Sequence, residues 1–338
     1  AAMAEVKRAR VEGPRGTGRV EVAKVVNMVK DSCARRITTG CPILDETLCG
    51  GLRTNSVHEV VGESNCGKTQ FCLQLLLTSQ WNEEHGGLGC KSLYINTEGS
   101  GGITATRLRE FADFHASKGF LCGGGEDEGE GLGPAQASLM SMDNIFIERC
   151  TTDDPNSLLE VLLRAKTLLE HHNVKLIVID SIANAFKGMS SSSLDDGGAQ
   201  KQQHESQRLT QVLYRTMNLL KRYACDYNAC VVITNHVADH IERVSVQRAT
   251  QALTETLCTS GRIVRASLGM GLAQSVTCRY FVSRLEGVRL NENEYDTSGC
   301  VRAFEVVFSP FQAKRKTKYI INQSGVWGIP DAVYETGQ

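Results

Sequence analysis

The sequence lacks the features that would assign it to a functional class at once. Its 37 basic and 38 acidic residues leave a formal net charge of −1, so overall charge indicates no particular partner. No apolar run approaches the ~20 residues that a membrane-spanning helix needs, and no signal peptide is recognisable, so we expect no membrane partner. Thirteen cysteines are scattered without a CxxC pair, which favours reduced, mostly buried thiols over a zinc site or a disulfide framework.

Short apolar runs alternate with helical patterns from residue 37 onward. This alternation predicts an α/β fold, in which a mostly parallel sheet is covered by helices on both faces. Asp154 and Pro155 form an N-cap and first helical residue, and so mark where one of these helices begins. The expected strands are 58–62, 92–96, 144–150, 176–180 and 229–234, and the expected helices are 68–81, 155–173 and 205–228. Three later runs, 278–285, 301–308 and 317–322, predict an antiparallel C-terminal edge.

Three parts of the chain have compositions that do not predict a packed structure. Residues 1–36 carry nine basic and four acidic side chains, and we expect a basic, partly disordered tail before one core at 37–335. Glycine-rich and low-complexity stretches predict disordered insertions near 119–134 and 188–204. Residues 237–267 show no clear period, which is typical of a long functional or disordered loop.

The octapeptide GESNCGKT at 62–69 has the G-x-x-x-x-G-K-[ST] pattern of a phosphate-binding loop. It follows a strand-like run and opens an apolar helix, as the mechanism requires. Glycine at both ends lets backbone amides approach phosphate oxygens, and the helix N-terminus favours an anion. We therefore predict that Lys68 binds the phosphates of ATP and serves its hydrolysis, while Thr69 ligates Mg²⁺. The predicted nucleotide-binding residues are Gly62, Glu63, Ser64, Asn65, Cys66, Gly67, Lys68, Thr69 and Gln70.

Polar residues follow three of the expected strands and complete this interpretation. Asp180 ends the run LIVID, where a carboxylate would face the phosphates and hold Mg²⁺; a solvated aspartate at a strand end is the alternative. Glu98 follows the strand at 92–96, where it could activate the attacking water. Asn235 follows the strand at 229–234 and either contacts the γ-phosphate, relays its presence to the next loop, or is a simple turn residue.

Several segments together resemble one family. ITTGCPILDETLCGGL before the phosphate loop, then TEG, LIVIDS and VVITN in that order, are similar to the RecA-type recombinases. The resemblance covers residues 36–331 and is greatest to a paralogue of the eukaryotic strand-exchange branch. It implies a RecA-like P-loop NTPase core that acts in homologous recombination and double-strand-break repair in the nucleus. It also implies ATP at a subunit boundary, Glu98 as the water-activating glutamate, and three partners: another recombinase paralogue, the main strand-exchange recombinase, and single-stranded or branched DNA.

The chain also departs from the family pattern at two places. His236 follows Asn235 where the main recombinases have Asn-Gln, and Phe308-Ser309-Pro310 stands where they have Asp-Ser-Pro, near the cap over a neighbour's ATP. Such a cap would lack its carboxylate, so we expect no self-assembling filament. Two functions therefore stay open. One is a DNA-dependent ATPase or strand-exchange motor, and the other, which we favour, is a mediator in which ATP regulates complex assembly.

DNA contact is implied by the resemblance more than by charge. The stretches near 188–204 and 237–266 fall where the family has its two DNA-facing loops, yet they are almost electrically balanced and hold few aromatic side chains. The candidate DNA-binding residues are Arg243, Arg248, Arg262 and Arg265. A basic run at 314–318 is a further candidate, for which a solvated strand edge is an equal alternative.

Overall fold

The computed structural model describes residues 34–98, 101–118, 141–150, 154–187, 199–239, 257–285 and 300–330. The predicted tail, almost entirely, and the insertion near 119–134 lie outside these residues, as do Arg243 and Arg248. The predicted disorder near 188–204 is wrong for its last part, because helix α8 (Ala199–Asp226) already includes 199–204. The periodic apolar residues predicted a helix from residue 205, but the helix itself begins at Ala199, in a stretch without apolar periodicity.

A nine-stranded sheet forms the centre of the fold, in the order β14-β13-β12-β11-β3-β7-β6-β4-β5. Its strands are β3 (Ser56–Gly62), β4 (Lys91–Asn96), β5 (Ile145–Arg149), β6 (Val174–Asp180), β7 (Cys230–Asn235), β11 (Cys278–Arg284), β12 (Arg302–Phe308), β13 (Lys316–Asn322) and β14 (Gly325–Ile329). The strands from β11 to β5 pair in parallel, and those from β11 to β14 pair antiparallel. The predicted α/β class and antiparallel C-terminal edge are confirmed. One detail is wrong: β11, expected to be purely antiparallel, pairs in parallel with β3 and joins the two parts of the sheet.

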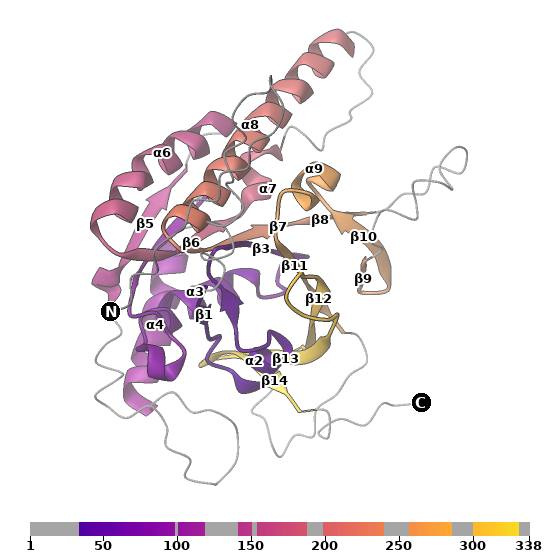
Figure 1. Ribbon diagram of the computed structural model, residues 1–338. Coiled ribbons are helices and arrows are strands. Elements are labelled where there is room, and N and C mark those ends of the chain that lie inside the picture. The colour runs from indigo at the N-terminus through magenta and orange to yellow at the C-terminus, as the bar shows by residue number, and fades with distance from the viewer. Residues whose placement is uncertain are drawn as a thin grey trace, which may run out of the picture. The chain divides into compact units, whose positions relative to one another are not determined.

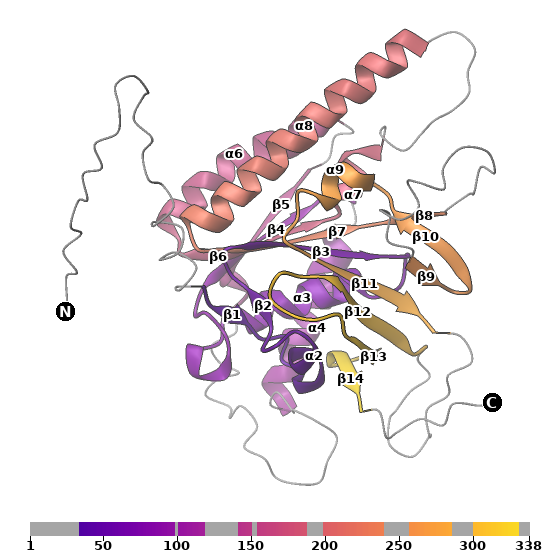
Figure 2. The same ribbon diagram turned by 45° about the vertical axis from the view of Figure 1, so that its right-hand side comes forward.

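Helices cover both faces of this sheet, as the alternation predicts (Figures 1 and 2). The helices α3 (Lys68–Thr78) and α4 (Gly101–Lys118) pack on one face, and α6 (Pro155–His171) and α8 on the other. Strand β6 shows how both faces of the sheet are buried. Its side chains alternate, with Leu176 and Val178 in the α3 cluster and Ile177 and Ile179 in the α6–α8 cluster. A continuous apolar run is the pattern expected of such a strand.

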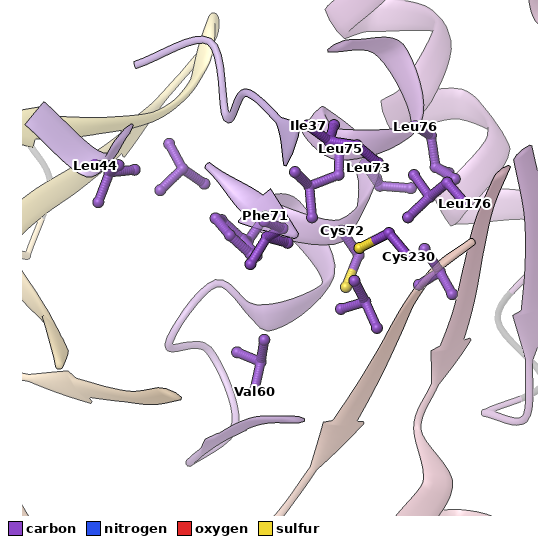
Figure 3. Close-up of a cluster of buried hydrophobic side chains, with 14 of the residues drawn as sticks. Ile37, Leu44, Val60, Phe71, Cys72, Leu73, Leu75, Leu76, Leu176 and Cys230 are labelled. Carbon is purple, nitrogen blue, oxygen red and sulfur yellow. The ribbon is translucent and has the colours of Figure 1, made fainter. Parts of the chain in front are cut away.

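The first of these two clusters anchors the helix that follows the phosphate loop. Figure 3 shows Phe71 and Cys72 of α3 beside Val60, Leu176 and Cys230 of the central strands. All five side chains are buried. Most of the described cysteines are likewise buried free thiols, which confirms their predicted role as small core residues. The loop between β3 and α3 is therefore held at both ends by the core.

A small second sheet occupies part of the region expected to be loop. Strands β8 (Val237–Asp239), β9 (Leu257–Thr259) and β10 (Arg262–Ala266) pair antiparallel in the order β8-β10-β9. The expectation of an irregular stretch over 237–267 is therefore wrong at both of its ends. These strands are only three to five residues long, too short for periodicity to reveal them in the sequence.

The remaining elements are short and flank the sheet. They are β1 (Arg36–Ile37), α2 (Pro42–Thr47), β2 (Leu52–Arg53), the 3₁₀ turns η1 (Glu83–His85) and η2 (Met142–Asn144), α7 (Ile182–Ala185) and α9 (Gly269–Ala273). None of the described helices is long and apolar enough to cross a membrane.

Candidate nucleotide-binding site

The predicted phosphate loop runs from the end of β3 to the start of α3. Gly67 caps α3 with φ of 91°, in the left-handed region that glycine adopts without steric cost. A Cβ at Gly62 would collide with the carbonyl oxygen of Val282 on the neighbouring strand β11. Both glycines of the motif are thus required by the backbone itself. The loop they shape leaves the amides at the N-terminus of α3 available to an anion.

Lys68 is buried under this loop. Its Nζ donates hydrogen bonds to the carbonyl oxygens of Gly62 at 2.9 Å and Glu63 at 2.8 Å. Burial lowers the pKa of the Lys68 ammonium, and the nearby carboxylates of Asp180 and Glu98 act in the opposite direction. A desolvated cation beneath a ring of amides is a strong attractor for phosphate.

The carboxylate of Asp180 lies at the tip of β6, next to the phosphate loop. The Thr69 hydroxyl donates to its Oδ2 at 2.7 Å, and the Tyr94 hydroxyl donates to the same oxygen at 2.9 Å. Thr234 at the end of β7 donates to Oδ1. Three strands and one helix therefore fix a single carboxylate, which is only 5% exposed. The solvated-aspartate alternative does not describe this residue.

Glu98 follows β4 on the other side of the same pocket. Its Oε1 accepts hydrogen bonds from Ser181 Oγ at 3.1 Å and His236 Nε2 at 3.0 Å. The hydrogen bond from His236 lowers the pKa of the Glu98 carboxyl, and that effect outweighs partial burial. The carboxylate stays ionised at neutral pH and is held in one direction, as a residue that accepts a proton from water must be.

These groups line one cavity of about 870 Å³. Eight of the predicted site residues line it: Ser64, Asn65, Gly67, Lys68, Thr69, Gln70, Glu98 and Asp180. The other lining residues are Arg107, His236, Arg284, Cys300, Arg302 and Ile321. The structure therefore brings together the phosphate loop, the carboxylate at the end of β6 and the glutamate after β4, although Thr69 and Asp180, for example, are 111 residues apart in the sequence.

Comparison with known proteins agrees with this arrangement. Residues 30–119 and 134–269, more than half of the chain, match the Rad51 family. The chain belongs to the Rad51 family. It is also 29% identical over 309 residues to the DNA repair protein XRCC3 homolog of Arabidopsis thaliana, covering 87% of this chain and 93% of that protein.

Two further relatives place the chain within this family. The DNA repair protein XRCC3 of Bos taurus is 28% identical over 298 residues, 88% of this chain and 75% of its own. The DNA repair and recombination protein RadA of Aeropyrum pernix is 32% identical over 203 residues, 60% of this chain and 53% of its own. The greater coverage of the XRCC3 proteins confirms the resemblance to a RecA-type paralogue.

In this Rad51-family chain, Asn235 lies outside the cavity lining. Its side chain is fully buried, and its Nδ2 donates to Glu59 Oε1 at 2.8 Å. Its Oδ1 accepts from Ser267 Oγ at 2.7 Å. The structure thus gives no direct path from Asn235 to a γ-phosphate, and the neighbouring His236 takes the position in the pocket. The contact with Ser267, which follows β10, fits the alternative in which Asn235 relays to the next segment.

Three other predicted residues of the loop, Gly62, Glu63 and Cys66, also lie outside the lining. Cys66 is buried, and its carbonyl accepts a hydrogen bond from the Tyr319 hydroxyl. Glu63 is 6% exposed and turns away toward β9 and β10. It accepts hydrogen bonds from Thr259 and Ser260 at 3.3 Å each, and from Arg262. The motif identified the loop correctly but did not indicate which side chains face inward.

The candidate DNA-binding arginines differ in their surroundings. Arg262 pairs with Glu63 and, at 3.2 Å, with Asp239, so two carboxylates already balance its charge. Arg265 on β10 is exposed to solvent. The basic run at 314–318 leads into β13, which is paired with β12 and β14. Among the described strands, β14 joins β13 only from Lys318 onward, and residues 314–316 are exposed, which agrees with the strand-edge alternative for this run.

Sequence reasoning missed the arginines of the pocket. Arg107 comes from α4, and its Nε donates to Gln70 Oε1 at 3.0 Å. Arg284 ends β11 and Arg302 begins β12, far from any motif. Each lies in a stretch of strand or helix that has no recognisable motif. It lines the pocket only because that element packs beside the phosphate loop.

Proposed function

We propose that this Rad51-family chain is an ATP-binding recombinase paralogue that assists homologous recombination and DNA double-strand-break repair. ATP would regulate its assembly with partners and with single-stranded DNA. The observation that carries the proposal is the cavity in which Lys68, Thr69, Asp180 and Glu98 meet. The printed names of its relatives, two DNA repair proteins and a DNA repair and recombination protein, support the biological setting.

The residues present fit ATP and Mg²⁺. The glycine-shaped loop supplies amides that no Cβ obstructs, and Lys68 supplies a buried cation for the β- and γ-phosphates. Thr69 and Asp180 present a hydroxyl and a carboxylate within 2.7 Å of each other, an oxygen pair suited to a hard cation. Mg²⁺ neutralises phosphate charge when bound. Tyr94 orients the same carboxylate from the next strand.

Glu98 is the group that would activate water. Ser181 and His236 aim its carboxylate from two sides, and its lowered pKa keeps it ionised. This arrangement also favours the second candidate function, a self-sufficient DNA-dependent ATPase or strand-exchange motor. We favour the regulatory role because Phe308, where the main recombinases carry a carboxylate, instead packs against the Arg279 guanidinium, 5.4 Å from its ring centre.

The partners we propose follow from the family. They are another recombinase paralogue in a hetero-oligomer, the main strand-exchange recombinase, and single-stranded or branched DNA. The proposed location is the nucleus, with the cytoplasm as a second compartment. Arg265, exposed on β10, and Arg262, Arg243 and Arg248 are the residues we propose for DNA contact.

The test is ATP binding and hydrolysis by the purified chain, with and without single-stranded DNA. We expect Lys68→Ala to weaken ATP binding by about tenfold or more, because it removes a charged hydrogen-bond donor from a buried site. We expect Glu98→Gln to bind ATP normally and to hydrolyse it more slowly. Lys166→Ala, which removes an exposed lysine of α6 outside the cavity, is the matched control.

The outcomes separate the two functions. Tight binding with slow turnover, unaffected by DNA, favours ATP as a regulator of assembly, and binding of a partner paralogue should then depend on Lys68. Strong DNA-stimulated turnover that is lost in both variants favours the self-sufficient motor. Failure of the unaltered chain to bind ATP would overturn the proposal.

A further inference from the structure

Two arginines of the cavity lining lie opposite each other on neighbouring strands. Arg284, the last residue of β11, and Arg302, the first of β12, are direct cross-strand partners. Both line the cavity. Like charges directly opposite each other on paired strands are destabilising unless something neutralises them. The pairing therefore calls for a negative group between or beside the two guanidinium groups.

The described carboxylates satisfy this need only in part. Arg284 donates from Nη2 to Glu63 at 3.3 Å, but Glu63 also binds Arg262. The Nε of Arg284 is buried without a hydrogen-bond partner in the described part of the chain. Arg302 donates to two carbonyl oxygens, those of Asn65 at 3.2 Å and Cys300 at 2.7 Å.

Strand register places this pair at a defined end of the phosphate loop. Val282 of β11 pairs with Gly62 of β3, so β11 emerges beside the first residues of the loop, and Arg284 contacts Glu63 there. The Lys68 ammonium binds the carbonyls of the same two loop residues, Gly62 and Glu63. In a loop of this kind the lysine serves the β- and γ-phosphates. Arg284 is thus at the terminal-phosphate end of the loop, and its cross-strand partner Arg302 contacts the loop further along, at the carbonyl of Asn65.

Charge in the cavity is consistent with a highly anionic ligand. The lining includes four basic side chains, Lys68, Arg107, Arg284 and Arg302, and two carboxylates, Glu98 and Asp180. Arginine presents a planar fork of donors that suits phosphate oxygens better than a lysine does. Two such forks on adjacent strands can hold one phosphate group from two directions.

We propose that Arg284 and Arg302 form a cationic clamp, supplied by the chain itself, for the terminal phosphate of the bound nucleoside triphosphate. Glu63 positions Arg284 by holding one of its nitrogens. The clamp would make the site discriminate a triphosphate from a diphosphate within one subunit. This inference rests on the proposed function, because it assumes that the cavity takes a nucleotide.

The experiment measures ATP and ADP dissociation constants with Mg²⁺ by calorimetry for the full chain and its variants. For Arg284→Ala and Arg302→Ala, we expect the ATP constant to rise about tenfold or more, and the ADP constant to change by less than about threefold. Arg284→Lys keeps the charge and loses the planar fork of donors. Its ATP dissociation constant should lie between those of Arg284→Ala and the unaltered chain. Arg164→Ala, which removes an exposed arginine of α6 outside the lining, should change neither constant.

Each result bears on a separate claim. Equal losses of ATP and ADP affinity, or no loss in either arginine variant, would overturn the clamp while leaving ATP binding intact. An unaltered chain that binds neither nucleotide would instead overturn the proposed function. Circular dichroism of each variant verifies folding, and if Arg284→Ala does not fold, Arg302→Ala and Arg284→Lys carry the same comparison.

Discussion

At the scale of single residues, the site depends on a buried ion pair beneath it. Arg279 on β11 donates to Glu59 on β3 at 2.7 Å, and their side chains are 8% and 0% exposed. Asn235 adds a third member through its amide. This pair ties together the three adjacent strands that carry the phosphate loop, Arg284 and His236.

Replacing one member of this ion pair should lower the free energy of unfolding far more than replacing both. We expect Arg279→Met to lower the free energy of unfolding by about 3–5 kcal/mol, because it leaves the Glu59 carboxylate buried without its cation. The double variant Glu59→Gln with Arg279→Met should recover much of that loss. Urea denaturation of the three proteins is the measurement. Equal stability of the single and double variants would contradict this account.

Residue patterns in the sequence predicted the chemistry of the loop but not all of its geometry. Lys68 and Thr69 lie where the motif required them, because the motif is contiguous and its backbone is set by local glycine conformation. Asn235 was expected near the phosphate, and His236 is found there instead. Adjacent residues at the end of a strand point to opposite faces of the sheet. An error of one residue in locating that end therefore assigns a buried side chain to the site in place of the side chain that lines it.

At the scale of elements, helix α6 shows how local sequence fixes a boundary. Asp154 is its N-cap, accepting a hydrogen bond from the Asn156 amide at 3.1 Å, and Pro155 is its first residue, as predicted. The cap satisfies one of the helix amides that has no partner within the helix. This helix packs against α8 on the face of the sheet opposite the phosphate-loop helix.

Loss of this cap should therefore reduce stability without affecting the nucleotide site. We expect Asp154→Ala to lower the free energy of unfolding by about 1 kcal/mol, and Asp154→Ser, which can also cap, to lower it less. Thermal unfolding with and without ATP is the measurement. A selective loss of ATP affinity in Asp154→Ala would show that α6 is coupled to the site in a way this structure does not explain.

Most of the elements that escaped prediction are short, although the 18-residue helix α4 was missed as well. Strands β8, β9 and β10 have three to five residues each, and their register comes from pairing with one another rather than from their own periodicity. Strands β6 and β7 of the central sheet carry nearly continuous apolar runs, which burial on both faces requires. The direction of β11 was missed for a related reason: a strand's sequence does not say whether its neighbour runs with it or against it.

At the scale of the whole molecule, two buried histidines make folding sensitive to acid. Burial lowers the pKa of His58 to about 4, and burial also lowers that of His115 to about 4. In the unfolded chain both titrate near 6.5. Between these values the unfolded state binds more protons than the folded state, so stability falls as the pH is lowered from about 6.5 toward 4.

The loss of stability at acid pH should be measurable as a lower midpoint of urea denaturation. At pH 5 we expect each histidine to contribute a loss on the order of 1–2 kcal/mol relative to pH 7. Urea denaturation at the two pH values tests this expectation. His115→Gln can still donate to the carbonyl of Ser324. Its free energy of unfolding should differ less between pH 5 and pH 7 than that of the unaltered chain. An unchanged difference would rule out His115 as a source of the acid sensitivity.

The α/β class, the phosphate loop, the carboxylate at the end of β6 and the cap of α6 could all be predicted from the amino-acid sequence. Each of these follows from interactions between residues close together in the chain, or from an apolar run that burial demands. The contact of His236 with Glu98 and the pairing of Arg284 with Arg302 beside the loop became visible only in the folded chain. These contacts join residues 138 positions apart in the first case and 18 in the second. They arise from strand order and register, which the packing of the whole sheet sets and no local pattern encodes.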